Sequence, residues 1–204
     1  TIITRNIFEK HFFCSLSKLK KLCFYFCKMK KIKTSCFRNK TVLIRVDFNV
    51  PLNKDLSVRD NSRIVAALDT IKHVIQAGGK VVILSHLGRP GGKVESRFSL
   101  INIIPELSKL LKQKVEFIQN YLKKSATIKI KSSEPGSVFL LENMRFNKNE
   151  KLGCKIFAKN IAQLGDWYVN DAFGTLHRDH ASTSKIAGFF NDKKCFGFLV
   201  EKEL

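Results

Sequence analysis

The chain has 204 residues, of which 44% are hydrophobic, and this is enough for one domain with a buried core. Its modest glycine and proline content excludes a collagenous or broadly disordered chain, and the sequence has no apolar run of about 18 residues that could span a membrane as a helix. Lysine and arginine outnumber aspartate and glutamate by 37 to 17, which gives a formal net charge of +20.

Half of this charge lies in the first 40 residues, where eleven Lys or Arg residues stand against one acid, Glu9. The change of composition predicts a boundary near residue 40, and we assign residues 1–38 to a basic tail. Three interpretations of the tail stay open: a targeting segment, an arm that binds nucleic acid or a membrane surface, and residues read upstream of the true start, because the first methionine is Met29.

The six cysteines give little indication of function. Four lie in the tail, and the other two, Cys154 and Cys195, are isolated. Since no C-x-x-C unit is matched by a second one, the spacing predicts reduced thiols and no zinc site.

From residue 41 onward, short apolar runs alternate with segments of helical periodicity. We predict strands at 41–46, 80–85, 115–118, 137–142 and 166–171, and helices at 99–113 and 154–165. A further helix is expected to begin at one of residues 60–62 and to end at Gly78 or Gly79, and Pro105 is a weak point of the helix at 99–113. The region 119–136 gives no clear pattern beyond a turn near its end. Alternating strands and helices predict an α/β fold, a doubly wound parallel sheet with helices on both faces.

Polar side chains follow four of the predicted strands, at the point where each strand ends. In an open parallel sheet, ligands bind at the carboxyl ends of the strands, and these ends share one edge. An arginine near the start of the first helix is expected to face the same edge. The residues are Asp47 and Asn49, His86 and Arg89, Asn143 and Arg145, then Asp171, His177, Arg178 and His180, together with Arg63.

This combination predicts a pocket for a small, highly charged anion. The planar guanidinium group suits carboxylate and phosphate, because it offers two parallel hydrogen bonds. Gly88 would let the backbone approach the ligand, and Pro90 would stiffen the loop. Taken singly, each residue could be a surface charge or a turn residue, but four strand ends of the same character favour a site. The sequence has no P-loop, no G-x-G-x-x-G, no G-x-S-x-G and no H-E-x-x-H.

Five motifs together resemble the amino-terminal domain of phosphoglycerate kinase, with most similarity to bacterial-type members. They are RVDFNVP (45–51), SHLGRP (85–90), LLENMRF (140–146), YVNDAFGTLHRDHAS (168–182) and GFLVEKEL (197–204). The resemblance implies a Rossmann-like domain at 39–195 that binds 3-phosphoglycerate or 1,3-bisphosphoglycerate. It also implies that residues 196–204 begin a link to a second domain, which would bind Mg²⁺ with ADP or ATP and which this chain lacks.

The resemblance also assigns roles to individual residues. Arg63 is the residue that the family places nearest the transferring phosphoryl group, and we expect it to be catalytic. The expected substrate-binding residues are Asp47, Phe48, Asn49, Arg63, His86, Leu87, Gly88, Arg89, Arg145, His177 and Arg178, and no metal ligand is expected in this chain.

These assignments make the chain the phosphoglycerate-binding part of a glycolytic kinase, expected to be inactive alone. We expect a cytoplasmic monomer, with organelle targeting by residues 1–38 left open, and no nucleic-acid or membrane partner. Two alternatives stay open. One is a basic nucleic-acid-binding protein, although aromatic residues such as Phe139 and Trp167 lie inside apolar runs, whereas stacking platforms need exposed rings. The other is a non-catalytic truncated copy.

Overall fold

The computed structural model describes Ile32 and residues 36–204, so most of the predicted tail lies outside the described residues. Within this part of the chain, six strands form one parallel sheet in the order β3-β4-β2-β1-β5-β6. The strands are β1 (Thr41–Arg45), β2 (Lys80–Leu84), β3 (Val115–Ile118), β4 (Val138–Leu141), β5 (Trp167–Asn170) and β6 (Lys194–Phe196). The five predicted strands are confirmed, and β6 is an addition at the edge of the sheet.

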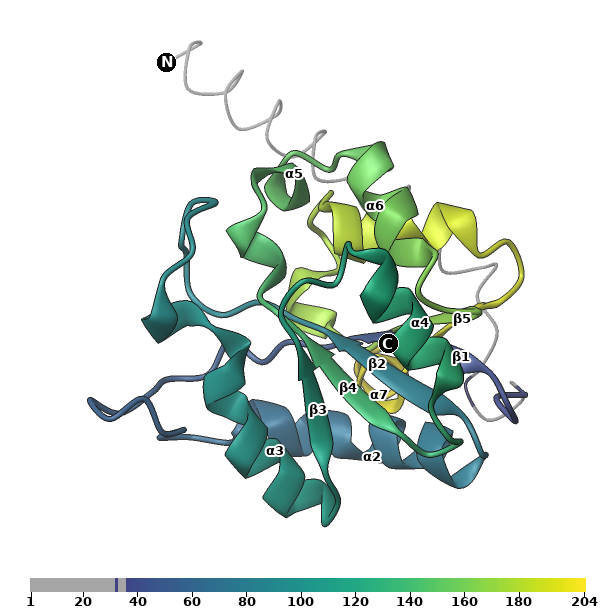
Figure 1. Ribbon diagram of the computed structural model, residues 1–204, viewed down its shortest axis with the longest axis horizontal. Helices are drawn as coiled ribbons and strands as arrows, with labels where there is room; N and C mark the ends of the chain where they lie inside the picture. Colours follow the sequence, from purple (N-terminus) through teal and green to yellow (C-terminus); the bar gives the residue numbers. More distant parts are fainter. Residues whose placement is uncertain (1–31, 33–35) are drawn as a thin grey trace, which may run out of the picture.

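Helices cover both faces of the sheet, as the alternating pattern predicts (Figure 1). Along β1, Val42 and Ile44 face one core cluster, which also includes Ile71, while Leu43 faces a second cluster with Ile161. This alternation follows from the pleat of a strand, and it makes both faces of β1 apolar because both are covered. The helices are α2 (Ser62–Gln76) and α3 (Ile104–Leu111) on one face, α4 (Lys124–Ser132) and α6 (Lys155–Ala162) on the other, and the short α5 (Lys148–Lys151) and α7 (Phe198–Glu203).

The segment predicted as one helix at 99–113 is divided in two. A 3₁₀ helix, η3 (Leu100–Ile103), precedes α3, and Pro105 lies in the first turn of α3. A proline is tolerated there because the first turn of a helix has no carbonyl partner for its N–H groups. Pro105 therefore marks where the α-helix begins.

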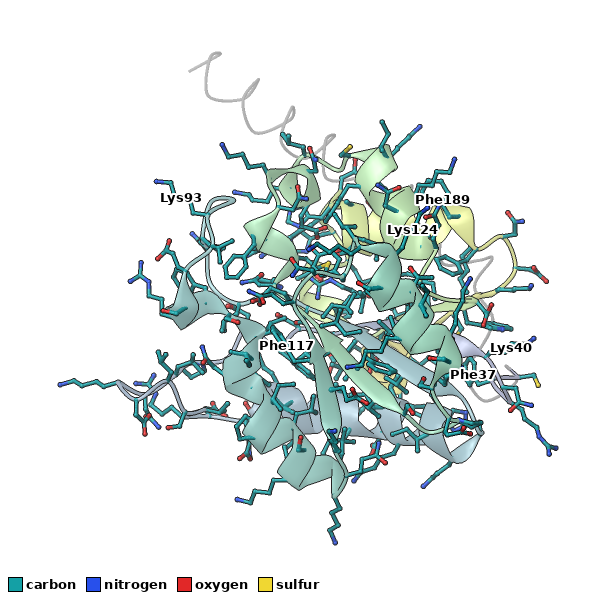
Figure 2. All side chains as sticks on the ribbon, in the orientation of Figure 1. Phe37, Lys40, Lys93, Phe117, Lys124 and Phe189 are labelled. Carbon is teal, nitrogen blue, oxygen red and sulfur yellow. The ribbon has the colours of Figure 1, made fainter. Side chains whose placement is uncertain are left out.

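Residues before the predicted boundary at 39 pack against the domain. Phe37 is fully buried, and its ring meets the edge of Trp167 with a centroid distance of 5.4 Å. Ile32 is also fully buried, and its backbone N–H donates to Glu201 Oε1 at 2.9 Å. In Figure 2 Phe37 lies beside Lys40, close to where β1 begins. In the described residues, no helix is long and apolar enough to cross a membrane.

Candidate anion-binding site

The predicted site lies at the carboxyl ends of the four central strands. β1 is flanked by β2 on one side and by β5 on the other, and β4 pairs with the far edge of β2. The loops that follow these four strands are therefore neighbours, although they are far apart in the sequence. The hydrogen bonds described below show how these loops are connected.

Asp47 connects the end of β1 to the first turn of α2. Its Oδ2 atom accepts a hydrogen bond from Arg63 Nη1 at 2.5 Å, and its side chain is largely buried whereas that of Arg63 is half exposed. A Cβ atom on Gly174 would lie 3.6 Å from the same carboxylate oxygen, so the segment after β5 also approaches it. Arg63 thus faces the predicted edge and is held by a carboxylate.

Asn49 joins the loop after β1 to the loop after β2. Its Oδ1 atom accepts from the backbone N–H of Gly88 at 2.8 Å. Gly88 has φ of +64°, and an added Cβ would lie 2.3 Å from ring atoms of Phe98. Position 88 therefore requires glycine both for its backbone conformation and for the space available. Phe48 and Leu87, both in the predicted substrate-binding set, are buried hydrophobic residues of the core.

Arg145 fixes the third loop to the second. Its Nη1 atom donates to the Gly88 carbonyl at 2.7 Å, and its backbone N–H donates to Asn143 Oδ1 at 3.0 Å. Burial, and then the charges of Arg178 and Arg45, lower the pKa of Arg145 to about 10. At neutral pH it remains a buried cation, which is the condition for strong attraction of an anion.

His86 is held as a neutral ring beside this arginine cluster. Its pKa is far below the ordinary value, first because the ring is buried and then because Arg45, Arg145 and Arg178 are cationic. The Nδ1 atom lies 3.2 Å from Arg45 Nη2 and 3.7 Å from Asp47 Oδ1. Arginine can only donate, so Nδ1 is the acceptor, and in a neutral ring the proton is then on Nε2. His86 therefore keeps one N–H donor directed away from Arg45.

His180 belongs to the same electrostatic cluster. Burial, and then the charges of Arg145, Arg178 and Arg45, lower its pKa to about 4. Burial first, and then three nearby arginines, therefore keep both histidines neutral at physiological pH. An anion that enters would therefore be attracted by the arginines, while the neutral imidazole rings can offer hydrogen bonds.

The structure does not join every predicted residue to this cluster. Arg89 and His177 are exposed, and among the described residues no hydrogen bond or ion pair links either of them to the cluster. Arg178 is half-buried and affects the cluster through its charge, as the lowered pKa values of Arg145 and His86 show. In the described residues no group of three His, Cys, Asp or Glu side chains could hold a metal ion.

Sequence reasoning missed Arg45, which is the last residue of the central strand β1 and is only 1% exposed. Its Nη1 atom donates to the Val46 carbonyl, and its Nε atom donates to Ser182 Oγ at 3.1 Å. The sequence contained one indication of its role, which is a charged residue inside an otherwise apolar strand. Burying a charge without partners is very costly, so such a residue is expected to have specific partners.

Comparisons with known proteins give one family. The family described as "Phosphoglycerate kinase" matches residues 32–204. The chain is 44% identical over 167 residues to a phosphoglycerate kinase of Chlorobium chlorochromatii, covering 82% of this chain and 42% of the relative. It is 48% identical over 167 residues to one of Anaeromyxobacter sp., covering 81% and 42%.

Solved structures give the same result. Phosphoglycerate kinase from Coxiella burnetii superposes with a TM-score of 0.77 at 41% identity, covering 86% of this chain and 43% of that chain. The Pyrococcus horikoshii enzyme superposes with a TM-score of 0.75 at 36% identity, covering 86% and 44%. The chain spans less than half the length of the curated relatives it matches.

Proposed function

Since this chain belongs to the phosphoglycerate kinase family, we propose that it supplies the part that binds 3-phosphoglycerate or 1,3-bisphosphoglycerate. The reaction would transfer a phosphoryl group from 1,3-bisphosphoglycerate to ADP and, in reverse, from ATP to 3-phosphoglycerate. One observation carries the assignment to this edge of the sheet. The carboxyl ends of the strands converge on three clustered arginines and a neutral histidine that offers an N–H donor. Such a site suits a ligand with a carboxylate and a phosphate.

In the proposed complex, different loops bind different ends of the ligand. Asp47 and Asn49 would bind the glycerate hydroxyl and carboxylate end, since both lie in the loop that follows β1. The guanidinium group of Arg145 and the charge of Arg178 would hold the distant phosphate. Fixing both ends of the ligand would align the transferring group for in-line attack.

Arg63 is the proposed catalytic residue of this domain. Its side chain is half exposed, so its guanidinium group could move from Asp47 toward a ligand with little cost of desolvation. Phosphoryl transfer depends on positioning and on neutralising charge on the equatorial oxygens, and a guanidinium group at the edge of the site could do this.

The nucleotide and Mg²⁺ are assigned to the second domain of the family, so this chain alone should not transfer phosphate. The absence of a P-loop and of other nucleotide motifs in its sequence supports that assignment. We further propose that the protein works as a cytoplasmic monomer, as expected for a glycolytic member of the family.

Calorimetric titration of the 204-residue chain tests the binding role. We expect saturable binding of 3-phosphoglycerate that weakens as salt is added, and no binding of MgATP. Arg145→Ala should weaken 3-phosphoglycerate binding by about tenfold or more, because it removes charge-assisted donors. Lys129→Ala removes an equal charge from α4, where Lys129 pairs with Glu116 at 2.6 Å, and should leave binding unchanged. Tight MgATP binding, or no 3-phosphoglycerate binding by the parent chain, would overturn the proposal.

A further inference from the structure

Glu150 is a buried carboxylate next to the arginine cluster. It lies in the short helix α5 and is only 1% exposed. Its Oε2 atom accepts from the backbone N–H of Ser182 at 3.0 Å, and its Oε1 atom accepts from Ser182 Oγ at 2.6 Å. Within the described residues it forms no ion pair with an arginine, and its Oε1 atom lies 3.9 Å from His180 Nδ1. Its contact with the arginines therefore passes through Ser182.

Ser182 connects this carboxylate to Arg45. The hydroxyl oxygen donates to Glu150 and accepts from Arg45 Nε at 3.1 Å. A hydroxyl has a single proton, and an ionised carboxylate can only accept a hydrogen bond. The Ser182 hydroxyl therefore donates its proton in the hydrogen bond to Glu150, and a lone pair of Oγ faces Arg45. The direction of the Ser182 hydroxyl is thus set by the charge of Glu150.

The connection continues from Arg45 to His86. The guanidinium Nη2 atom donates to His86 Nδ1 at 3.2 Å, and this contact keeps the ring proton on Nε2. Without it, Nδ1 could carry the proton and turn toward Asp47 Oδ1, which lies at 3.7 Å. The His86 tautomer therefore depends on how firmly Arg45 is held.

We propose that Glu150 is a positioning residue of the anion site, which acts through Ser182 and Arg45 to keep His86 in its Nε2–H form. This inference rests on the proposed function and adds a residue to the same site. The effect of Glu150 would reach the site through hydrogen bonds that join α5, the segment after β5, β1 and the loop after β2.

If Glu150 acted only through its negative charge, it would weaken anion binding, whereas a positioning role would strengthen it. A carboxylate beside a phosphate site repels the ligand, and Glu150 also raises the pKa of Arg145, which shows that its field reaches the cluster. Neutralising Glu150 would then tighten anion binding if its role were purely electrostatic. A positioning role predicts weaker binding, so the sign of the change separates the two.

The first measurement uses the ligand-free chain. In Glu150→Gln the amide group donates to Ser182 Oγ, so the hydroxyl proton is pushed toward the Arg45 Nε–H and that hydrogen bond weakens. Nitrogen-15 NMR of the His86 ring distinguishes its two tautomers. We expect the Nε2–H form in the parent chain and a substantial Nδ1–H fraction in the variant.

A matched control removes a carboxylate at the opposite end of the strands. Asp166 is exposed and accepts from the Thr41 backbone N–H at 2.8 Å, where β1 begins. Asp166→Asn changes the net charge by the same amount and should leave the His86 tautomer as in the parent. An unchanged tautomer in Glu150→Gln would overturn the proposal.

The second measurement is calorimetric titration with 3-phosphoglycerate. Glu150→Gln should bind about tenfold more weakly than the parent, the size expected for one hydrogen bond to a charged group, whereas Asp166→Asn should not. Equal or tighter binding by Glu150→Gln would overturn the positioning role and leave the proposed function in place. A parent chain that does not bind would overturn the proposed function itself.

Ser182→Ala provides the same test if Glu150→Gln does not fold. This variant keeps the carboxylate and its bond to the Ser182 backbone N–H, and it removes only the hydroxyl that faces Arg45. It should also increase the Nδ1–H fraction of His86 and weaken 3-phosphoglycerate binding. Parent-like behaviour in both measurements would show that the connection through Ser182 does not operate.

Discussion

Replacing Phe37 by alanine should strongly destabilise the domain, although Phe37 lies in the segment that composition assigns to the tail. The side chain is fully buried in the core cluster that also contains Trp167 and Val74. Its ring makes edge contacts with Trp167, at a centroid distance of 5.4 Å, and with His73, at 6.2 Å.

The expected loss is about 3–5 kcal/mol, the range for a buried phenylalanine cut back to alanine, since both the transfer free energy and a cavity contribute. This is a large part of the roughly 5–15 kcal/mol that stabilises a typical domain. Urea unfolding followed by tryptophan fluorescence would measure it, because Trp167 is the only tryptophan and contacts the substituted ring. The midpoint should fall with little change in the slope.

Phe189→Ala is the matched control, because that ring is 42% exposed on the surface of the molecule. It should cost about 1 kcal/mol or less, as surface substitutions usually do. If Phe37→Ala unfolded at the same urea concentration as the parent, Phe37 would not belong to the core. A chain shortened to begin at Arg38 would then be as stable as the full chain.

Two further predictions concern the site. In the corresponding full-length enzyme, Arg63→Ala should lower kcat by roughly two to four powers of ten, while Arg178→Ala should mainly raise KM. This difference is expected if only Arg63 contacts charge that develops in the transition state. Steady-state kinetics of both variants at one ionic strength would measure it, and an unchanged kcat for Arg63→Ala would refute the role of Arg63. The pKa of His86 in the folded state lies far below the ordinary value of 6.5, so below about pH 6.5 the unfolded chain binds a proton that the folded chain does not. The free energy of unfolding should therefore be unaffected by His86 above about pH 6.5 and should decrease below it, by on the order of 1.4 kcal/mol per pH unit. His86→Gln should flatten the acid side of the curve of unfolding free energy against pH, and a slope equal to that of the parent would show that His86 is protonated in the folded state.

The sequence by itself determined the class of fold and the edge of the sheet at which the proposed site residues gather. Buried parallel strands read as apolar runs, and parallel strands bring their carboxyl ends to one edge, so the positions of Asp47, His86 and Arg145 followed from chain order alone. Helix α4 was missed because Ala126, Ile128 and Ile130 alternate like a strand. In the structure Ala126 and Ile130 are buried, four residues apart, while Ile128 is 66% exposed.

Only the tertiary structure decided how the side chains of the site are paired. Arg45 reads from sequence as one charge in a strand, and its contact with Ser182 spans 137 residues. The neutral state of His86 and the burial of Glu150 likewise depend on which groups surround them in space. Strand and helix patterns are local and repeat along the chain, whereas a hydrogen bond between distant segments depends on packing to within a few tenths of an ångström, which local pattern does not encode.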